Sequence, residues 1–136
     1  MTGEAAAVAG ELVLGADTIV ALDGDVLGKP PDAAHARAYL DRLNGRIHEV
    51  VGAIAVSRAG NTVAAVETTR VAFRSVSGAT LDWYVATGEW EGRAGGYAIQ
   101  GAGAALVAAI EGDYLNVVGL PLARLLDLVP DLLGTA

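Results

Sequence analysis

The sequence contains no cysteine and little positive charge, and each shortage excludes a class of protein. Without cysteine there is no disulfide, no thiolate metal site and no cysteine nucleophile. Nine Lys and Arg against sixteen Asp and Glu give a formal net charge of −7. The basic residues are scattered along the chain, whereas nucleic-acid binders usually carry a basic patch. This charge does not exclude the binding of a small phosphorylated ligand, because a few local cations and a metal ion suffice to bind it.

Long apolar runs are also absent, although 53% of the 136 residues are hydrophobic. No run approaches the roughly 18 residues that a membrane helix needs. The first residues, MTGEAAAVAGE, lack the basic region and the apolar core of a signal peptide. We therefore expect a single cytoplasmic domain that has neither a membrane nor a nucleic-acid polymer as a partner.

Hydrophobic patterns along the chain predict an α/β fold, with one β-sheet and helices packed on it. Asp32 is the expected N-cap of a helix that runs to about Leu43 and stops at Asn44-Gly45. Two long strands then form an antiparallel hairpin around Ala59-Gly60-Asn61. The other expected elements are a helix over 3–10, strands over 12–14, 18–22 and 104–110, helices over 81–86 and from 121, and a loop over 112–119.

The stretch Leu12–Pro31 carries the clearest chemical signal. Asp17 follows an apolar run, where it either caps a turn or serves as a metal ligand or general base. Lys29 is restricted by the two prolines that follow it, and a held ammonium suits a phosphate oxygen; a solvated loop lysine is the alternative. Ligands of open α/β sheets gather beyond the carboxyl ends of the strands, so we expect a site there.

Residues 88–103 contain six glycines. Glycines let backbone N–H groups approach a phosphate closely, but neither GxGxxG nor GxxxxGK[ST] is present, so a plain irregular connection is the alternative. Arg93, Tyr97 and Gln100 are the polar groups of this segment. Gln100 offers a donor and an acceptor, which reading a nucleobase edge requires. His48, at the start of a strand, is interpreted as structural rather than as a ligand.

Six segments, taken in order, resemble the Maf family, the septum-formation inhibitor-like nucleoside triphosphate pyrophosphatases. The resemblance spans nearly the whole chain from about residue 4. It implies a Maf/ITPase-like fold, a twisted mixed β-sheet flanked by helices, and hydrolysis of a nucleoside triphosphate to the monophosphate and pyrophosphate. The matching segments are GADTIV at 15–20, GKP at 28–30, LNGRIHEV at 43–50, ETTRVAFR at 67–74, YVATGEWEGRAGGYAIQGAGA at 84–104 and IEGDYLNVVGLPLARL at 110–125.

The resemblance also implies roles for five residues. Asp17, in the ADT motif, would bind a divalent metal cation, Mg²⁺ or Mn²⁺, and accept the proton of the attacking water. Lys29, in GKP, would bind the substrate, as would Arg93, which stands where the family usually has lysine before AGxY and so changes the geometry of the cation. Thr18 and Gln100 match the subgroup that acts on dTTP and UTP, not the methylated-GTP subgroup.

One part of the family pattern is absent. Members normally open with a strand and a loop carrying Ser-x-x-Arg, followed by an acidic residue and a helix containing lysine. We therefore expect residues 1–136 to form a single Maf-like domain that is N-terminally truncated relative to the family. The alternative to an active enzyme is a catalytically impaired Maf-like protein that binds nucleotides or acts in cell division. A homodimer is also expected, since an open sheet edge favours self-association.

Overall fold

The computed structural model describes residues 5–8 and 12–134. In these residues six strands form one sheet of order β1-β2-β4-β5-β6, with β3 paired to β2. The strands are β1 (Ala5–Val8), β2 (Leu12–Leu22), β3 (Asp25–Leu27), β4 (Ile47–Arg58), β5 (Asn61–Phe73) and β6 (Val107–Glu111). The helices are α1 (Ala33–Leu43), α2 (Gly78–Ala86), α3 (Tyr114–Val118) and α4 (Leu122–Leu128), with 3₁₀ segments η1 (Ala94–Gly96) and η2 (Ala102–Leu106). The predicted α/β fold class is confirmed.

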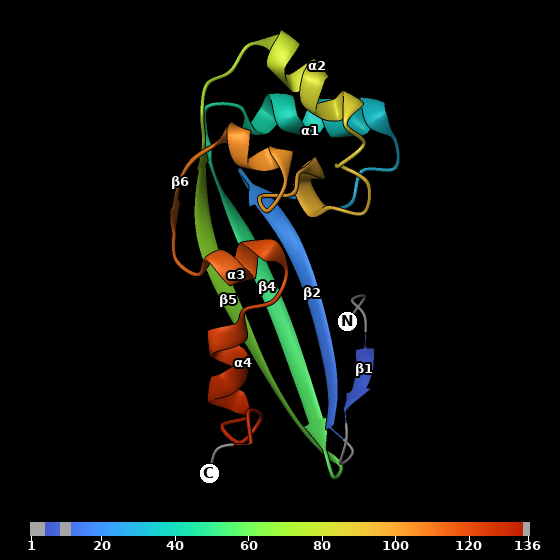
Figure 1. Ribbon diagram of the computed structural model, residues 1–136, viewed down its shortest axis with the longest axis vertical. Coiled ribbons are helices and arrows are strands. Elements are labelled where there is room, and N and C mark those ends of the chain that lie inside the picture. The colour runs from blue at the N-terminus through green and yellow to red at the C-terminus, as the bar shows by residue number, and fades with distance from the viewer. Residues whose placement is uncertain (1–4, 9–11, 135–136) are drawn as a thin grey trace.

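The core lies on one face of the long strands β2, β4 and β5. Along β4 the even-numbered residues from His48 to Val56 are buried, and the odd-numbered residues between them are more exposed. A strand alternates its side chains between the two faces, so this pattern places the core on one side of the sheet. Figure 1 shows α1, α2 and the 3₁₀ segments at one end of these strands, with α3 and then α4 further along them. One apolar cluster joins the sheet to α1, α2 and the 3₁₀ segments and reaches Val117 and Val118 of α3, and a second joins the sheet to α4.

Helix α1 forms as its sequence predicts. The Asp32 carboxylate accepts the backbone N–H of His35 at 2.8 Å, which satisfies one of the donors at the helix start. Ala36, Leu40 and Leu43 form its buried stripe. The backbone N–H of Asn44 donates to the Leu40 carbonyl at 2.9 Å and closes the last turn. Local signals alone therefore determine both ends of this helix.

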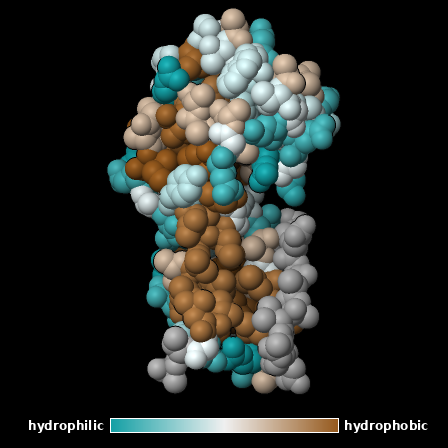
Figure 2. All heavy atoms as spheres, in the orientation of Figure 1, coloured by the Kyte–Doolittle hydropathy of each residue, from teal (hydrophilic) through white to brown (hydrophobic). Residues whose placement is uncertain are grey.

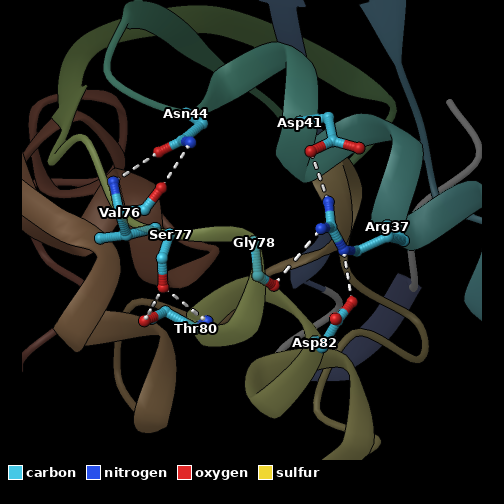
Figure 3. Close-up of polar contacts among 8 residues, drawn as sticks. All are labelled: Arg37, Asp41, Asn44, Val76, Ser77, Gly78, Thr80 and Asp82. Carbon is cyan, nitrogen blue, oxygen red and sulfur yellow. Dashed lines mark hydrogen bonds and ion pairs between the residues drawn. The ribbon is translucent and has the colours of Figure 1, made fainter.

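Polar contacts join α1 to α2 and to the segment that precedes it (Figure 3). Arg37 donates to Asp41 on its own helix, to Asp82 on α2 at 2.8 Å and to the Gly78 carbonyl at 3.3 Å. The Asn44 side chain donates to the Val76 carbonyl and accepts the Val76 N–H, both at 2.9 Å. These contacts fix α2 against α1, which matters because α2 supplies a residue that holds the site.

Several sequence-based expectations are wrong. A mixed sheet was expected, but every described strand pair is antiparallel. The helix expected over 3–10 is instead strand β1 at Ala5–Val8, and the rest of that range lies outside the described residues. Alanine favours helix by only about a few tenths of a kcal/mol per residue over most others. Pairing of β1 with residues 12–15 of β2 overrides so small a preference.

Other boundaries also differ. The two strands expected over 12–14 and 18–22 are one continuous strand, β2. The strand expected over 104–110 begins only at Val107, after the 3₁₀ segment η2. The loop expected over 112–119 contains α3, because the Asp113 carboxylate accepts the N–H groups of Leu115 and Asn116 as a helix cap.

Apolar side chains gather over α3 and α4 on the face that Figure 2 shows. Leu125 and Val129 are buried against the sheet, whereas Leu115 and Leu122 are 44% and 37% exposed. Both helices are short, and no helix in the described ranges is long and apolar enough to cross a membrane.

We expect Asn44→Ala to lower the free energy of unfolding by about 1–3 kcal/mol, because it leaves both backbone groups of Val76 without their partner. Denaturant titration measures the change. Asn61→Ala, at the exposed start of β5, is the matched control and is expected to cost much less. Equal losses in the two variants would contradict this role of Asn44.

Candidate active site

A cavity of about 350 Å³ lies beside the middle of β2. The segments around it are β2, the loop after β3, the glycine-rich segment and the end of α3. All five predicted site residues line this one cavity: Asp17, Thr18, Lys29, Arg93 and Gln100. Residues far apart in the sequence therefore meet where the family resemblance implies a substrate site.

Asp17 and Thr18 occupy the middle of β2, where Asp17 pairs with Ala53 and Thr18 with Gly52 of β4. The expectation that Asp17 follows the end of a strand, or caps a turn there, is wrong. On the other edge of β2, β1 pairs with residues 12–15 and β3 with residues 20–22. The cavity adjoins the stretch of β2 between these two pairings. The Thr18 N–H donates to the Asp17 carboxylate at 3.0 Å.

The two cations of the cavity come from different loops. Lys29 is exposed, whereas Pro30 beside it is buried, so the proline anchors the loop that carries the ammonium. The backbone N–H of Gly95 donates to the Gly28 carbonyl at 3.1 Å and joins this loop to the segment that carries Arg93. Two cations and one carboxylate make the cavity locally positive in a chain of net charge −7.

Glu89 and Tyr84 hold the glycine-rich segment. The Glu89 carboxylate accepts the Tyr84 hydroxyl at 2.8 Å and the N–H groups of Ala102 and Gly103, each at 3.0 Å. Tyr84 O in turn accepts the N–H of Ala98 at 2.9 Å. Burial raises the pKa of Tyr84. Burial also acts to raise the pKa of Glu89, but the hydrogen bonds from Ala102, Gly103 and Tyr84, together with the charge of Arg93, outweigh it and lower that pKa below its usual range.

Sequence reasoning missed this pair. Tyr84 is fully buried in α2, and Glu89 reaches residues that lie 13 and 14 positions further along the chain. Neither residue lines the cavity. The sequence offered only a weak indication of this pair. A tyrosine precedes the glycine-rich segment and an acidic residue stands at its start, and the backbone N–H groups of the segment need acceptors.

An aromatic cluster lies behind the cavity. Tyr97 lines the cavity, and its hydroxyl lies 2.6 Å from Nε2 of His48. The rings of His48, Phe73 and Tyr97 pack edge to face, with centroids 4.8–5.4 Å apart. Burial lowers the pKa of His48 to about 4 and raises that of Tyr97. The interpretation of His48 as structural fits this buried position.

Asn116 anchors α3 to the sheet, and the next three residues line the cavity. It is fully buried, and its Nδ2 lies within 3.0–3.1 Å of the carbonyls of Val50 and Glu67 and of the Thr69 hydroxyl. A Cβ at Gly52 would overlap Oδ1 of Asn116, so only glycine permits this approach of α3 to β4. Glu67, a further carboxylate on β5, pairs with Arg124 at 3.1 Å and does not line the cavity.

The side chains around the cavity limit how a metal ion could be held there. The described residues contain no group of three or more His, Cys, Asp or Glu side chains that could hold one. Among the residues described around the cavity, Asp17 supplies the only carboxylate. Mg²⁺ is commonly held by one or two carboxylates together with water and substrate phosphates. Asp17 therefore fits a cation that is held jointly with a triphosphate, not one that is held by the protein alone.

Comparison with known proteins decides the family. A family model of Maf-like proteins matches residues 2–132. The chain belongs to the Maf family. It is 54% identical over 115 residues to a dTTP/UTP pyrophosphatase of Symbiobacterium thermophilum, covering 85% of this chain and 59% of that protein. It is 46% identical over 119 residues to a dTTP/UTP pyrophosphatase of Pyrococcus furiosus, covering 88% of this chain and 63% of that protein.

A third relative agrees. The dTTP/UTP pyrophosphatase of Anaeromyxobacter dehalogenans strain 2CP-1 is 51% identical over 125 residues, which is 89% of this chain and 64% of that protein. This Maf chain thus spans about three fifths of the length of the relatives it matches. The family resemblance drawn from the six motifs is confirmed.

Stability is expected to fall as the pH drops from about 6.5 to about 4, because His48 stays neutral when folded and is protonated when unfolded. The contribution reaches at most about 1.4 kcal/mol per pH unit. Denaturant titration across this range should show a flatter profile for His48→Gln. If the stability of His48→Gln changed with pH as steeply as that of the wild type, the pH dependence could not be assigned to His48.

Proposed function

We propose that this chain is a nucleoside triphosphate pyrophosphatase that hydrolyses dTTP and UTP to the monophosphate and pyrophosphate. The observation that carries the proposal is the convergence of Asp17, Thr18, Lys29, Arg93 and Gln100 on one cavity. Relatives 46–54% identical to it are named dTTP/UTP pyrophosphatases.

The proposed chemistry assigns one task to each kind of side chain. Asp17 accepts a proton from water, whose oxygen forms a bond to the α-phosphorus while the bond to the bridging oxygen of the leaving pyrophosphate breaks. Lys29 and Arg93 bind phosphate oxygens and offset the charge of the leaving group. Gln100 and Thr18 select the base, and the Gln100 amide can pair with a pyrimidine edge through its donor and its acceptor.

A divalent cation, Mg²⁺ or Mn²⁺, belongs to this proposal. Asp17 would hold it together with the triphosphate, since the cavity offers one carboxylate. When bound, the ion supplies charge neutralisation on the phosphate oxygens. A cytoplasmic location and a homodimer remain predictions from the sequence.

Purified protein with Mg²⁺ or Mn²⁺ is expected to release pyrophosphate from dTTP and UTP faster than from CTP, GTP or ATP. Asp17→Asn should lower this rate by about 10²-fold or more, because it removes the proton acceptor. The matched control is Asp23→Asn, in the exposed turn between β2 and β3, which should retain activity. If folded wild-type protein released no pyrophosphate from any of these nucleotides, the proposed hydrolysis would be wrong.

Lys29 permits a test of binding that is independent of activity, because it is the only lysine in the chain. Acylation of its exposed side-chain amine by an N-hydroxysuccinimide ester, followed by peptide mass spectrometry, reports its accessibility. Bound dTTP or UTP is expected to slow this acylation, because the phosphate oxygens would cover the amine. Protection without turnover would favour the alternative, an impaired Maf-like protein that still binds nucleotides. Acylation unaffected by nucleotide would contradict the role of Lys29.

A further inference from the structure

Gln100 lies in a turn whose two ends are held by side chains from outside it. The Gly101 N–H donates to the Ala98 carbonyl at 3.2 Å, which closes a turn around Ile99 and Gln100. Before this turn, the Ala98 N–H donates to the Tyr84 hydroxyl. After it, the N–H groups of Ala102 and Gly103 donate to the two oxygens of Glu89. The backbone that presents Gln100 is therefore held on both sides by one hydrogen-bonded pair.

The chemistry of this pair requires a carboxylate at position 89. Oε1 accepts the Tyr84 hydroxyl and the Gly103 N–H, while Oε2 accepts the Ala102 N–H. A glutamine would aim an NH₂ group at one of these donors, whichever way its amide turned, because only its oxygen accepts. The fit is close, since a Cβ at Gly101 would overlap the Glu89 carboxylate.

The pair is also fixed from behind, and one cation of the cavity, Arg93, lies within electrostatic reach of it. Tyr84 is fully buried in α2, the helix that Arg37 ties to α1. On the other side, Arg93 lies within electrostatic reach of both groups: its positive charge opposes the burial that raises the pKa of Tyr84, and it adds to the hydrogen bonds that lower the pKa of Glu89.

We propose that Glu89 and Tyr84 are positioning residues that set the base selectivity of this site by holding the turn that carries Gln100. This inference rests on the proposed pyrophosphatase function. Because the pair does not line the cavity, its effect reaches the substrate only through the backbone of residues 98–103. Loosening that backbone weakens recognition of the base, which is binding present in both the ground state and the transition state.

The test compares Glu89→Gln and Tyr84→Phe with Glu91→Gln, which removes the same charge from an exposed position two residues further on. Amide hydrogen exchange should lose protection at Ala102 and Gly103 in Glu89→Gln and at Ala98 in Tyr84→Phe. Both variants should raise KM for dTTP by about tenfold with a smaller change in kcat. Glu91→Gln should match the wild type in both measurements.

A double-mutant cycle separates positioning from general stabilisation. In a Gln100→Ala background, Glu89→Gln should produce little further loss in the ratio of kcat/KM for dTTP over CTP, because the two residues act on the same contact. Fully additive losses would overturn the proposal, as would KM values equal to that of Glu91→Gln in an active enzyme. Wild-type protein that does not turn over any nucleotide would instead refute the proposed function.

Discussion

The site depends on the antiparallel ladder between β2 and β4, which pairs residues 13–21 with residues 49–57. This ladder fixes Asp17 and Thr18 within a rigid strand rather than on a loop. It also places Thr18 opposite Gly52, the glycine that lets Asn116 bring α3 against the sheet. The strand that carries Asp17 and Thr18 and the helix beside the cavity are therefore positioned by the same backbone pairing.

The glycine-rich segment is positioned by side chains rather than by a ladder. Tyr84 and Glu89 satisfy backbone donors of residues 98–103, and a buried donor without a partner would cost about 1–3 kcal/mol. The three hydrogen bonds that the Glu89 carboxylate accepts offset the free-energy cost of its partial burial. Arg93 and Gln100 can then lie on a loop that keeps its arrangement.

The sequence predicted what local signals determine. The cap at Asp32, the stop at Asn44 and the β4–β5 hairpin need only neighbouring residues, and all three are found. The five site residues were predicted from motif resemblance, and the structure brings them together. The strand at Ala5–Val8 escaped prediction because its partner, not its composition, decides its conformation. Glu89 escaped for a similar reason, since its role appears only when distant backbone groups approach it.

A glycine-rich segment is commonly regarded as mobile, but here the glycine at 101 permits close contact with Glu89 and thereby removes freedom. A nucleotide that enters this cavity meets a turn whose backbone is already ordered. Ordering a loop is one of the main entropic costs of association, and here the turn is already ordered when the chain folds, so binding does not carry that cost. Ligand affinity at such a site is then governed by the contacts themselves, and it should fall when either the supporting carboxylate or the glycine packed against it is replaced.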